Sequence, residues 1–368
     1  MSVVILHVAE TLKGGIASYL DEVLPFQVAT FGHDNVALLI PEDQAGEIKH
    51  GLGVKVVTFP PSGSRFRHVL QMMRSLQENL PTLQPALLHA HSSFAGAATR
   101  LFARRRGFPA RVIYCAHGWA FDRDAGRLSK AFYRWLESRL AHWCSSIVCI
   151  SRHDYDSARA ANLPAEKLVL IPNAIGPLTT STKTPDWPAG CKRFLFVGRL
   201  DRQKGADIFI ESMRRIRAPA FAYLAGAPVV SNADDMVLPD NVVATGWLDR
   251  NLIQAYIASA DVVVIPSRWE GFGLVTLEAM RAGKPVIASR TGGLVELVED
   301  GVTGKLIQPG CVNSLVEAME QACHEDWSEK GKAGRQRFLM TYTSDRLNNS
   351  LLETYKHVLA RTGHLALC

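Results

Sequence analysis

The residues with the clearest chemical potential lie in a loop that follows an apolar stretch and opens a predicted helix. Residues 267–280 read SRWEGFGLVTLEAM, so that seven residues separate Glu270 from Glu278. A carboxylate can accept hydrogen bonds from two neighbouring hydroxyl groups, so two carboxylates at this turn suit two sugars, a ribose and a hexose. The simpler alternative is an acidic helix start that favours the helix dipole.

Glycines in the same loop favour a phosphate ligand. Gly271 and Gly273, on either side of Phe272, let the backbone approach a ligand closely. The helix that opens at Leu274 supplies unpaired N–H groups and the positive end of its dipole, and both suit a phosphate.

Two basic residues follow another predicted strand. Arg199 and Lys204 come after the strand 194–197 and flank the start of a helix. A diphosphate leaving group gains charge as its bond to a sugar breaks, and basic side chains can neutralise that charge. The alternative is that both are solvated charges on a loop. Asp234 and Asp235 lie in a polar loop and do not form a D-x-D motif after a strand, so the sequence predicts no metal ion.

Two loops in the first half of the chain also follow predicted strands. Gly14 and Gly15 come after the strand 3–8, without the G-x-G-x-x-G spacing of a nicotinamide site. They form either a tight turn or a close approach to a phosphate or acceptor. His117 follows the strand 111–116, where a neutral imidazole either donates to a substrate hydroxyl or is satisfied by a backbone carbonyl.

His89 and His91 form an H-x-H pattern next to Ser92 and Ser93. The pattern suits zinc, but the sequence shows no third ligand within reach, so we expect an acceptor-side or a structural role. Ser151 follows the strand 147–150 and is predicted to cap the next helix.

A basic cluster combines Arg100, Arg104–Arg106 and Arg111. It is either a solvated helix end or a contact for the headgroup of a lipid-linked acceptor or an anionic membrane leaflet. We expect most of the nearby aromatic residues to be core, and these are Phe102, Phe108, Trp119, Phe121, Phe132, Tyr133 and Trp135.

Short apolar runs alternate with amphipathic stretches along the whole chain, which predicts parallel sheets covered by helices. In the first half, strands are predicted over 3–8, 35–40, 54–59, 86–91, 111–116, 147–150 and 166–171. In the second half, they are predicted over 194–197, 220–225, 242–245, 262–266 and 285–289. The proline- and threonine-rich segment between the two series predicts a linker, so we expect two doubly wound α/β domains.

The E-x7-E pattern of Glu270 and Glu278 within EGFGLVTLEAM resembles the signature of retaining glycosyltransferases of the glycosyltransferase-B fold, family 4. The likeness continues in the segment AGKPVIAS at 282–289, in TGG at 291–293 and in DGVTG at 300–304. Upstream, FVGRL at 196–200 with Lys204 is similar to the diphosphate-binding segment of that family. The turn IPNA at 171–174 is similar to its interdomain turn, with Ala174 in place of the usual glycine.

The resemblance implies an N-terminal acceptor-side Rossmann-like domain over 1–172, a linker over 173–192 and a nucleotide-sugar-binding Rossmann-like domain over 193–343. A C-terminal helix within 344–368 is expected to pack back on the N-terminal domain. The resemblance also implies catalytic roles for Glu270, His117, Arg199 and Lys204. The implied donor-binding residues are Gly15, Arg199, Lys204, Glu270, Gly271, Phe272, Gly273, Leu274 and Glu278.

The expected reaction is therefore transfer of a sugar, with retention and without a metal, from a nucleotide diphosphate donor that is most often a uridine diphosphate sugar. The acceptor is expected to be a saccharide or a lipid-linked molecule of polysaccharide or glycoconjugate biosynthesis. A nucleotide-sugar epimerase of the same architecture is the alternative enzyme, and a sugar-nucleotide binding protein without activity is the third possibility. No cofactor is expected, since the nucleotide sugar is a substrate.

Composition sets the remaining limits. The formal charge of +6 on 368 residues suits a diphosphate or an anionic lipid without requiring nucleic acid. The seven cysteines are scattered and form no C-x-x-C pair, which favours a reducing compartment and argues against a structural metal. The start of the chain reads as a strand and no apolar run is long enough to span a membrane. We therefore expect a cytoplasmic protein with possible peripheral contact to the inner face of the membrane.

Overall fold

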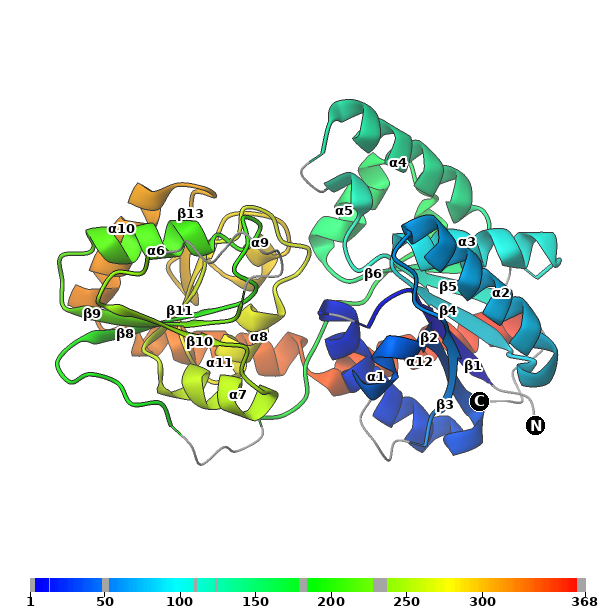
Figure 1. Ribbon diagram of the computed structural model, residues 1–368, viewed down its shortest axis with the longest axis horizontal. Coiled ribbons are helices and arrows are strands. Elements are labelled where there is room, and N and C mark those ends of the chain that lie inside the picture. Colours follow the sequence, from blue (N-terminus) through cyan, green and yellow to red (C-terminus); the bar gives the residue numbers. More distant parts are fainter. Residues whose placement is uncertain are drawn as a thin grey trace. The chain divides into compact units, whose positions relative to one another are not determined.

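The computed structural model describes residues 4–12, 14–47, 53–108, 111–122, 125–178, 184–227 and 237–362 (Figure 1). The chain divides into two compact units. The first unit comprises Met1–Ala174 together with Ser344–Cys368, and the second comprises Ile175–Thr343. The division falls between Ala174 and Ile175, at the end of the turn that resembles an interdomain turn, and places residues 175–192 in the second unit.

The first unit contains a seven-stranded parallel sheet in the order β3-β2-β1-β4-β5-β6-β7. Its strands are β1 (Ile5–Ala9), β2 (Val36–Pro41), β3 (Lys55–Phe59), β4 (Leu87–His91), β5 (Val112–Cys115), β6 (Ser146–Cys149) and β7 (Leu168–Leu170). Every residue of β1, β2, β4, β5 and β6 is buried, as expected for strands that are covered by helices on both faces.

The helices of the first unit alternate with these strands, and the last of them comes from the end of the chain. They are α1 (Gly15–Phe31), α2 (Arg65–Leu83), α3 (Ser93–Arg105), α4 (Arg127–Ala141), α5 (Arg152–Ala160) and α12 (Ser344–Arg361), with short 3-10 helices η1 (His33–Asn35), η2 (Glu42–Glu47), η4 (Ala120–Asp122) and η5 (Ala165–Lys167). Helix α12 packs against α1 within this unit (Figure 1). Ser151 caps α5 by accepting a hydrogen bond from the backbone N–H of Asp154 at 2.9 Å, which confirms the predicted cap.

The second unit contains a six-stranded parallel sheet in the order β10-β9-β8-β11-β12-β13. Its strands are β8 (Lys192–Val197), β9 (Ala220–Ala225), β10 (Val242–Gly246), β11 (Val262–Ile265), β12 (Val286–Ser289) and β13 (Gly304–Ile307). Its helices are α6 (Ala206–Arg215), α7 (Arg250–Ser259), α8 (Leu274–Arg281), α9 (Leu294–Leu297), α10 (Val312–His324) and α11 (Ser328–Thr341). Two elements were not predicted from the sequence: β13 is only four residues long, and α11 is rich in charged and polar residues.

In both sheets the strand order changes direction at one place. The change falls between β1 and β4 in the first unit, and between β8 and β11 in the second. Because the two crossovers leave such a pair of strands in opposite directions, the loops after their carboxyl ends separate and leave room for a ligand. We therefore expect the ligand to bind at these two edges. None of the helices that the structure describes is long and apolar enough to span a bilayer.

Candidate functional site

In the second unit, the loop after β8 lies directly on the loop after β11. Gly205 adopts a left-handed conformation (φ +74°), and a Cβ atom there would come within 2.2 Å of the carbonyl oxygen of Pro266. The backbone N–H of Arg268 donates to the carbonyl of Gln203 at 2.8 Å. Since β8 and β11 are neighbours at the change of strand order, these contacts join two distant segments at the edge where a ligand is expected.

This contact brings Lys204 and Glu270 together. The Nζ atom of Lys204 lies 2.5 Å from Oε2 of Glu270, and both side chains are largely buried, with 25% and 11% of their surface exposed. Ser267 donates a longer hydrogen bond of 3.3 Å from Oγ to the same carboxylate oxygen. One cation and one carboxylate that were predicted independently therefore form an ion pair at this edge.

A third loop, which follows β12, supports the backbone of Glu270 from the other side. Gly292 has a φ of +51°, and a Cβ atom at this position would lie 1.7 Å from the carbonyl oxygen of Glu270. Gly293 donates its backbone N–H to that oxygen at 3.4 Å. The segment TGG at 291–293 therefore requires glycine because the two loops approach too closely for a side chain.

The other basic residues near this edge already have partners. Arg199 donates to Oε1 of Gln203 at 2.7 Å and lies 3.1 Å from Asp201, within its own loop. Arg268 forms two hydrogen bonds with Asp207, at 2.8 and 2.6 Å. This pairing lowers the pKa of Asp207, although burial by itself would raise it. Arg199 thus lies on the same loop as Lys204 without joining the Lys204–Glu270 pair.

The remaining predicted residues surround the start of α8. Gly273 is its N-terminal cap, with a left-handed φ of +99°. Leu274 and Glu278 lie within the helix and are half-buried, and Gly271 precedes it. The side chain of Phe272 is only 3% exposed and its ring lies 6.1 Å from that of Tyr342, so this residue offers a ligand its backbone and not its ring.

In the first unit, Gly15 and His117 follow β1 and β5. Gly14 has a φ of +71°, and a Cβ atom at either Gly14 or Gly15 would meet nothing within 4 Å, so open space lies beside this helix start. His117 has a φ of +54° and is followed by Gly118 at +104°. A left-handed conformation is costly for histidine and is found more often at functional sites than elsewhere.

The first unit also contains a buried hydrogen-bonded group that the sequence analysis did not predict. This histidine cluster consists of His7, His89, His91 and His117 together with Gln27 and Tyr355. His89 and His91 lie inside β4 and are completely buried, which supports the structural alternative for the H-x-H pattern. The sequence does contain a signal for His7, because it is a polar residue in the otherwise apolar strand β1.

Burial keeps these imidazoles neutral. It lowers the pKa of His7 to about 4 and that of His117 to about 3. Burial also lowers the pKa of His89 and of His91 well below the usual value, and the neighbouring histidines add to the effect. At neutral pH each ring therefore has a single N–H group, and its hydrogen bonds decide which of the two nitrogen atoms carries the proton.

His7, His89 and His91 bring three ring nitrogens within 4.8 Å of one another, so His7 is the third histidine that the sequence did not show. However, Nδ1 of His7 and Nε2 of His91 are 2.9 Å apart. Two nitrogens bound to one tetrahedral zinc ion at about 2.0–2.1 Å would lie about 3.3 Å apart. The observed separation fits a hydrogen bond between the rings better than a shared metal ion.

The predicted basic cluster is smaller than expected, because Arg100 is not on the surface. Its side chain is buried, donates to Glu137 at 2.7 Å and lies over the ring of Tyr114. Attraction to Glu137 keeps the pKa of Arg100 above its usual value although burial opposes this. The three consecutive arginines Arg104–Arg106 are exposed at the end of α3.

Most of the seven aromatic residues near the basic cluster are buried in the core or packed against it, as expected, but two are exposed on α4. Phe132 is 54% exposed and Trp135 is 56% exposed, and Leu128 on the same helix is 89% exposed. Their spacing of four and three residues places them on one face. Arg127 and Arg134 are exposed beside them, and the helix has one acidic residue, Glu137, which is buried and paired with Arg100. The outer face of α4 is therefore apolar and cationic.

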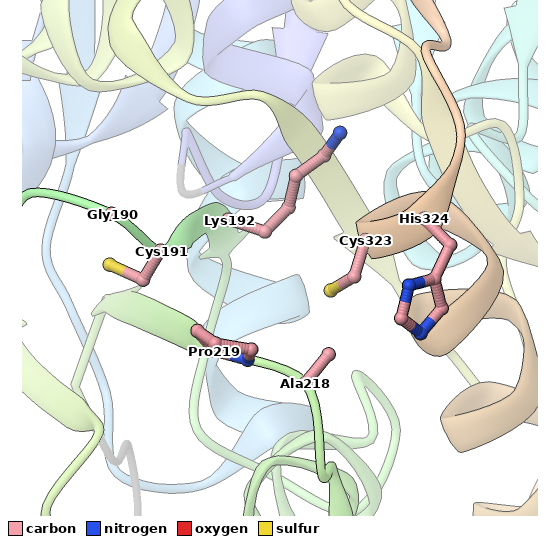
Figure 2. A pocket seen from close by; sticks show the side chains of 7 residues that line it. All are labelled: Gly190, Cys191, Lys192, Ala218, Pro219, Cys323 and His324. Carbon is pink, nitrogen blue, oxygen red and sulfur yellow. The ribbon is translucent and has the colours of Figure 1, made fainter.

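A pocket in the second unit lies away from the predicted site. It is formed by Gly190, Cys191, Lys192, Ala218, Pro219, Cys323 and His324 (Figure 2). Lys192 is the first residue of β8, and Ala218 and Pro219 directly precede β9. The pocket therefore lies at the amino ends of these two strands. Burial raises the pKa of the Cys323 thiol to about 11, so at neutral pH it is a poor nucleophile.

Two family models match the chain in its own order. The model described as "Glycosyl transferase 4-like domain" matches residues 14–174, and the model described as "Glycosyl transferases group 1" matches residues 191–325. Together they cover most of both units. The matches to glycosyltransferases leave the epimerase alternative without support.

Relatives and solved structures agree with these models. A 41.2 kDa uncharacterised protein of the cps region of Klebsiella pneumoniae is 29% identical, over 96% of this chain and 99% of that protein. The UDP-Gal:alpha-D-GlcNAc-diphosphoundecaprenol alpha-1,3-galactosyltransferase of Escherichia coli is 28% identical, over 71% of this chain and 73% of that enzyme. The fold is similar to that of sucrose-phosphate synthase from Thermosynechococcus elongatus, with a TM-score of 0.84, 20% identity, and coverage of 97% and 100%.

Proposed function

Because this chain belongs to the family 4-like glycosyltransferases with the glycosyltransferase-B fold, we propose that it transfers a hexose with retention from a uridine diphosphate sugar. The proposed acceptor is a lipid-linked saccharide. The similarity to a galactosyltransferase whose name specifies a diphosphoundecaprenol-linked acceptor supports both the donor and the acceptor class.

The observation that carries the proposal is the Lys204–Glu270 pair at the change of strand order of the second sheet. Without a ligand, the ammonium and the carboxylate neutralise each other. A nucleotide diphosphate sugar offers each of them its own partner, since the diphosphate attracts the lysine and the sugar hydroxyls donate to the carboxylate. A ligand with only the diphosphate would leave the carboxylate of Glu270 without a new partner, and a ligand with only the sugar would do the same to the ammonium of Lys204.

We propose that the leaving diphosphate also accepts the proton of the acceptor hydroxyl. The bond between the anomeric carbon and the phosphate oxygen breaks, the acceptor oxygen bonds to that carbon from the same face, and its proton passes to the departing phosphate oxygen. Lys204 and Arg199 stabilise the charge that develops on the diphosphate. Glu270 orients the hexose, and His117 is proposed to hydrogen-bond a hydroxyl of the donor sugar.

Product stereochemistry tests this function. Incubation with a panel of uridine diphosphate hexoses and a polyprenyl diphosphate N-acetylhexosamine acceptor should release uridine diphosphate only when both substrates are present. Proton NMR of the product should show the anomeric configuration of the donor. An inverted product would contradict retention, and a stable sugar adduct on Glu270 in the intact mass would contradict attack from the same face. Release of nucleotide without any acceptor-dependent product would contradict the transferase itself.

We expect the transfer to proceed without a metal ion, because Lys204 and Arg199 supply the positive charge that a metal would otherwise bring. Activity measured by nucleotide release should persist in excess EDTA. Loss of activity that only manganese or magnesium restores would contradict this expectation.

Glu278 is proposed to accept hydrogen bonds from the ribose hydroxyls. Glu278→Gln should weaken donor binding several-fold, because an amide oxygen accepts hydrogen bonds less strongly than a carboxylate, and Glu278→Ala should weaken it further. Titration calorimetry with uridine diphosphate alone measures the effect. Glu299→Gln, which changes a half-exposed carboxylate that pairs with Arg337, is the control and should leave the affinity unchanged. Unchanged affinity in Glu278→Ala would rule out the ribose contact.

The apolar and cationic face of α4 supports peripheral contact with an anionic bilayer. Exposed aromatic and leucine side chains can insert at the interface while arginines bind anionic headgroups. The double substitution Phe132→Ser and Trp135→Ser should lower binding to phosphatidylglycerol vesicles at least tenfold in a flotation assay. Met340→Ser changes an apolar side chain that is 70% exposed in the second unit and should have little effect. Equal binding to phosphatidylcholine vesicles, or no loss in the double variant, would contradict this contact.

A further inference from the structure

The histidine cluster forms a chain of hydrogen bonds that leads from the core of the first unit to His117. Oε1 of Gln27 lies 2.7 Å from Nε2 of His7, and Nδ1 of His7 lies 2.9 Å from Nε2 of His91. Nδ1 of His91 then lies 2.9 Å from Nε2 of His117. Three imidazole rings thus connect α1, β1 and β4 to the loop after β5.

The position of every proton in this series of hydrogen bonds follows from the Gln27 amide, with which the series begins. An amide oxygen has no proton to donate, so Nε2 of His7 must carry the proton of that ring. A neutral imidazole has one N–H group, so Nδ1 of His7 accepts, and Nε2 of His91 donates to it. By the same rule Nδ1 of His91 accepts the N–H of Nε2 of His117, which leaves Nδ1 of His117 without a proton.

The assignment follows from the orientation of the Gln27 amide, whose oxygen faces His7. Its Nε2 atom donates to the hydroxyl of Tyr355 on α12 at 3.0 Å, and that hydroxyl lies 2.8 Å from Nδ1 of His89. The reversed amide would place an N–H group against His7 and would reverse every proton along the chain. His89 is bonded to Tyr355 but to none of the rings that lead to His117.

We propose that Gln27, His7 and His91 are positioning residues that hold His117 as the Nε2–H tautomer, so that its Nδ1 accepts a hydrogen bond from a hydroxyl of the donor sugar. This inference rests on the proposed function for the identity of the ligand, whereas the tautomer rests on the hydrogen bonds alone. Among the described residues Nδ1 of His117 makes no hydrogen bond, and the residue is only partly buried.

An Nδ1 atom that only accepts would restrict which donor sugars His117 can bind. A group that only accepts requires an O–H donor from the ligand, so a sugar whose hydroxyl is replaced by hydrogen or blocked as a methyl ether leaves Nδ1 unpaired. If His117 were the other tautomer, it would donate, and a methyl ether oxygen would still be accepted. The two tautomers therefore predict opposite tolerance for O-methylated donors.

The experiment compares two histidines of the same strand. His91→Met breaks the chain, while His89→Met removes an equally buried imidazole two residues away that does not belong to it. Nitrogen-15 NMR of protein labelled on histidine, with the His117→Gln variant to assign its signals, reports which nitrogen of His117 carries the proton. We expect an unprotonated Nδ1 in the wild type and in His89→Met, and a mixture of tautomers in His91→Met. His91→Gln, whose amide keeps one donor and one acceptor, should restore the wild-type signal at least in part.

Kinetics with the accepted donor give the second readout. kcat/KM should fall about tenfold in His91→Met and change by less than threefold in His89→Met, with partial recovery in His91→Gln. A protonated Nδ1 on wild-type His117, or the same response in both methionine variants, would overturn the inference. Zinc retained by the purified protein and lost in both variants would replace it with a metal site. Failure of every sugar donor would contradict the proposed function, while the NMR result would still decide the tautomer.

Discussion

Lys204→Ala is expected to lower kcat about 10²- to 10³-fold, which is the cost of removing one preorganised group that stabilises charge in a transition state. The affinity for the donor should fall much less, since the charge on the leaving diphosphate is greater in the transition state than in the ground state. Rates of nucleotide release and calorimetry with the donor measure the two effects separately. The structural reason for this expectation is that Lys204 forms an ion pair with Glu270, which is 66 residues away in the sequence.

Lys305→Ala is the control for this substitution. Lys305 belongs to the same unit, its side chain is 41% exposed, and it has a long ion pair of 3.8 Å with Asp300, so its loss should change kcat less than twofold. Glu270→Gln adds a second comparison. An amide can still hydrogen-bond a hexose hydroxyl, so this variant should keep part of the activity. A Lys204→Ala enzyme that retained a third of the wild-type kcat would show that the ion pair is not part of the catalytic site.

Gly292→Ala is expected to abolish most of the activity and to destabilise the second unit. A Cβ atom would lie 1.7 Å from the carbonyl oxygen of Glu270, so the Glu270 loop must move to admit it. The left-handed conformation costs roughly 1–2 kcal/mol for alanine. The displaced backbone adds about 1–3 kcal/mol. We expect kcat/KM to fall more than tenfold, together with a lower free energy of unfolding in urea.

Gly301→Ala is the control that separates the cost of the left-handed backbone from the effect of the close contact with the Glu270 carbonyl. Gly301 has a φ of +81° and nothing within 4 Å of its would-be Cβ, so alanine there suffers the same kind of backbone strain without the contact. It should lose about 1–2 kcal/mol of stability and keep nearly all of its activity. Equal loss of activity in both variants would mean that the support given to the Glu270 loop is unimportant for catalysis.

The sequence predicted the fold class and most strands, because buried parallel strands are continuous apolar runs with turns at regular spacing. Strand β13 was not predicted because four residues are too few to show a strand pattern. Helix α11 was not predicted because its sequence has only a weak apolar face. The sequence also predicted that Glu270, Lys204 and the glycines near them lie in loops directly after strands, since an apolar run that ends in glycines and charged residues is a local pattern.

The surface was predicted less well than the core. Arg100 is buried against Glu137, while Phe132 and Trp135 are exposed on α4. Residue type alone assigns arginines to the outside and aromatic rings to the inside. The correct assignment depends on which face of α3 and α4 meets the sheet, and the tertiary structure decides this.

What the sequence determined by itself is the set of chemical groups and the loops that carry them, since the positions after strands follow from local pattern. Only the tertiary structure decided which of them meet. Lys204 reaches Glu270 because β8 and β11 are neighbours at the change of strand order. His7 meets His91 because β1 pairs with β4, with His7 opposite His89 in the register, and α12 returns to place Tyr355 beside them. Strand order and register are long-range properties of the packed sheet, so no local pattern in the sequence contains them.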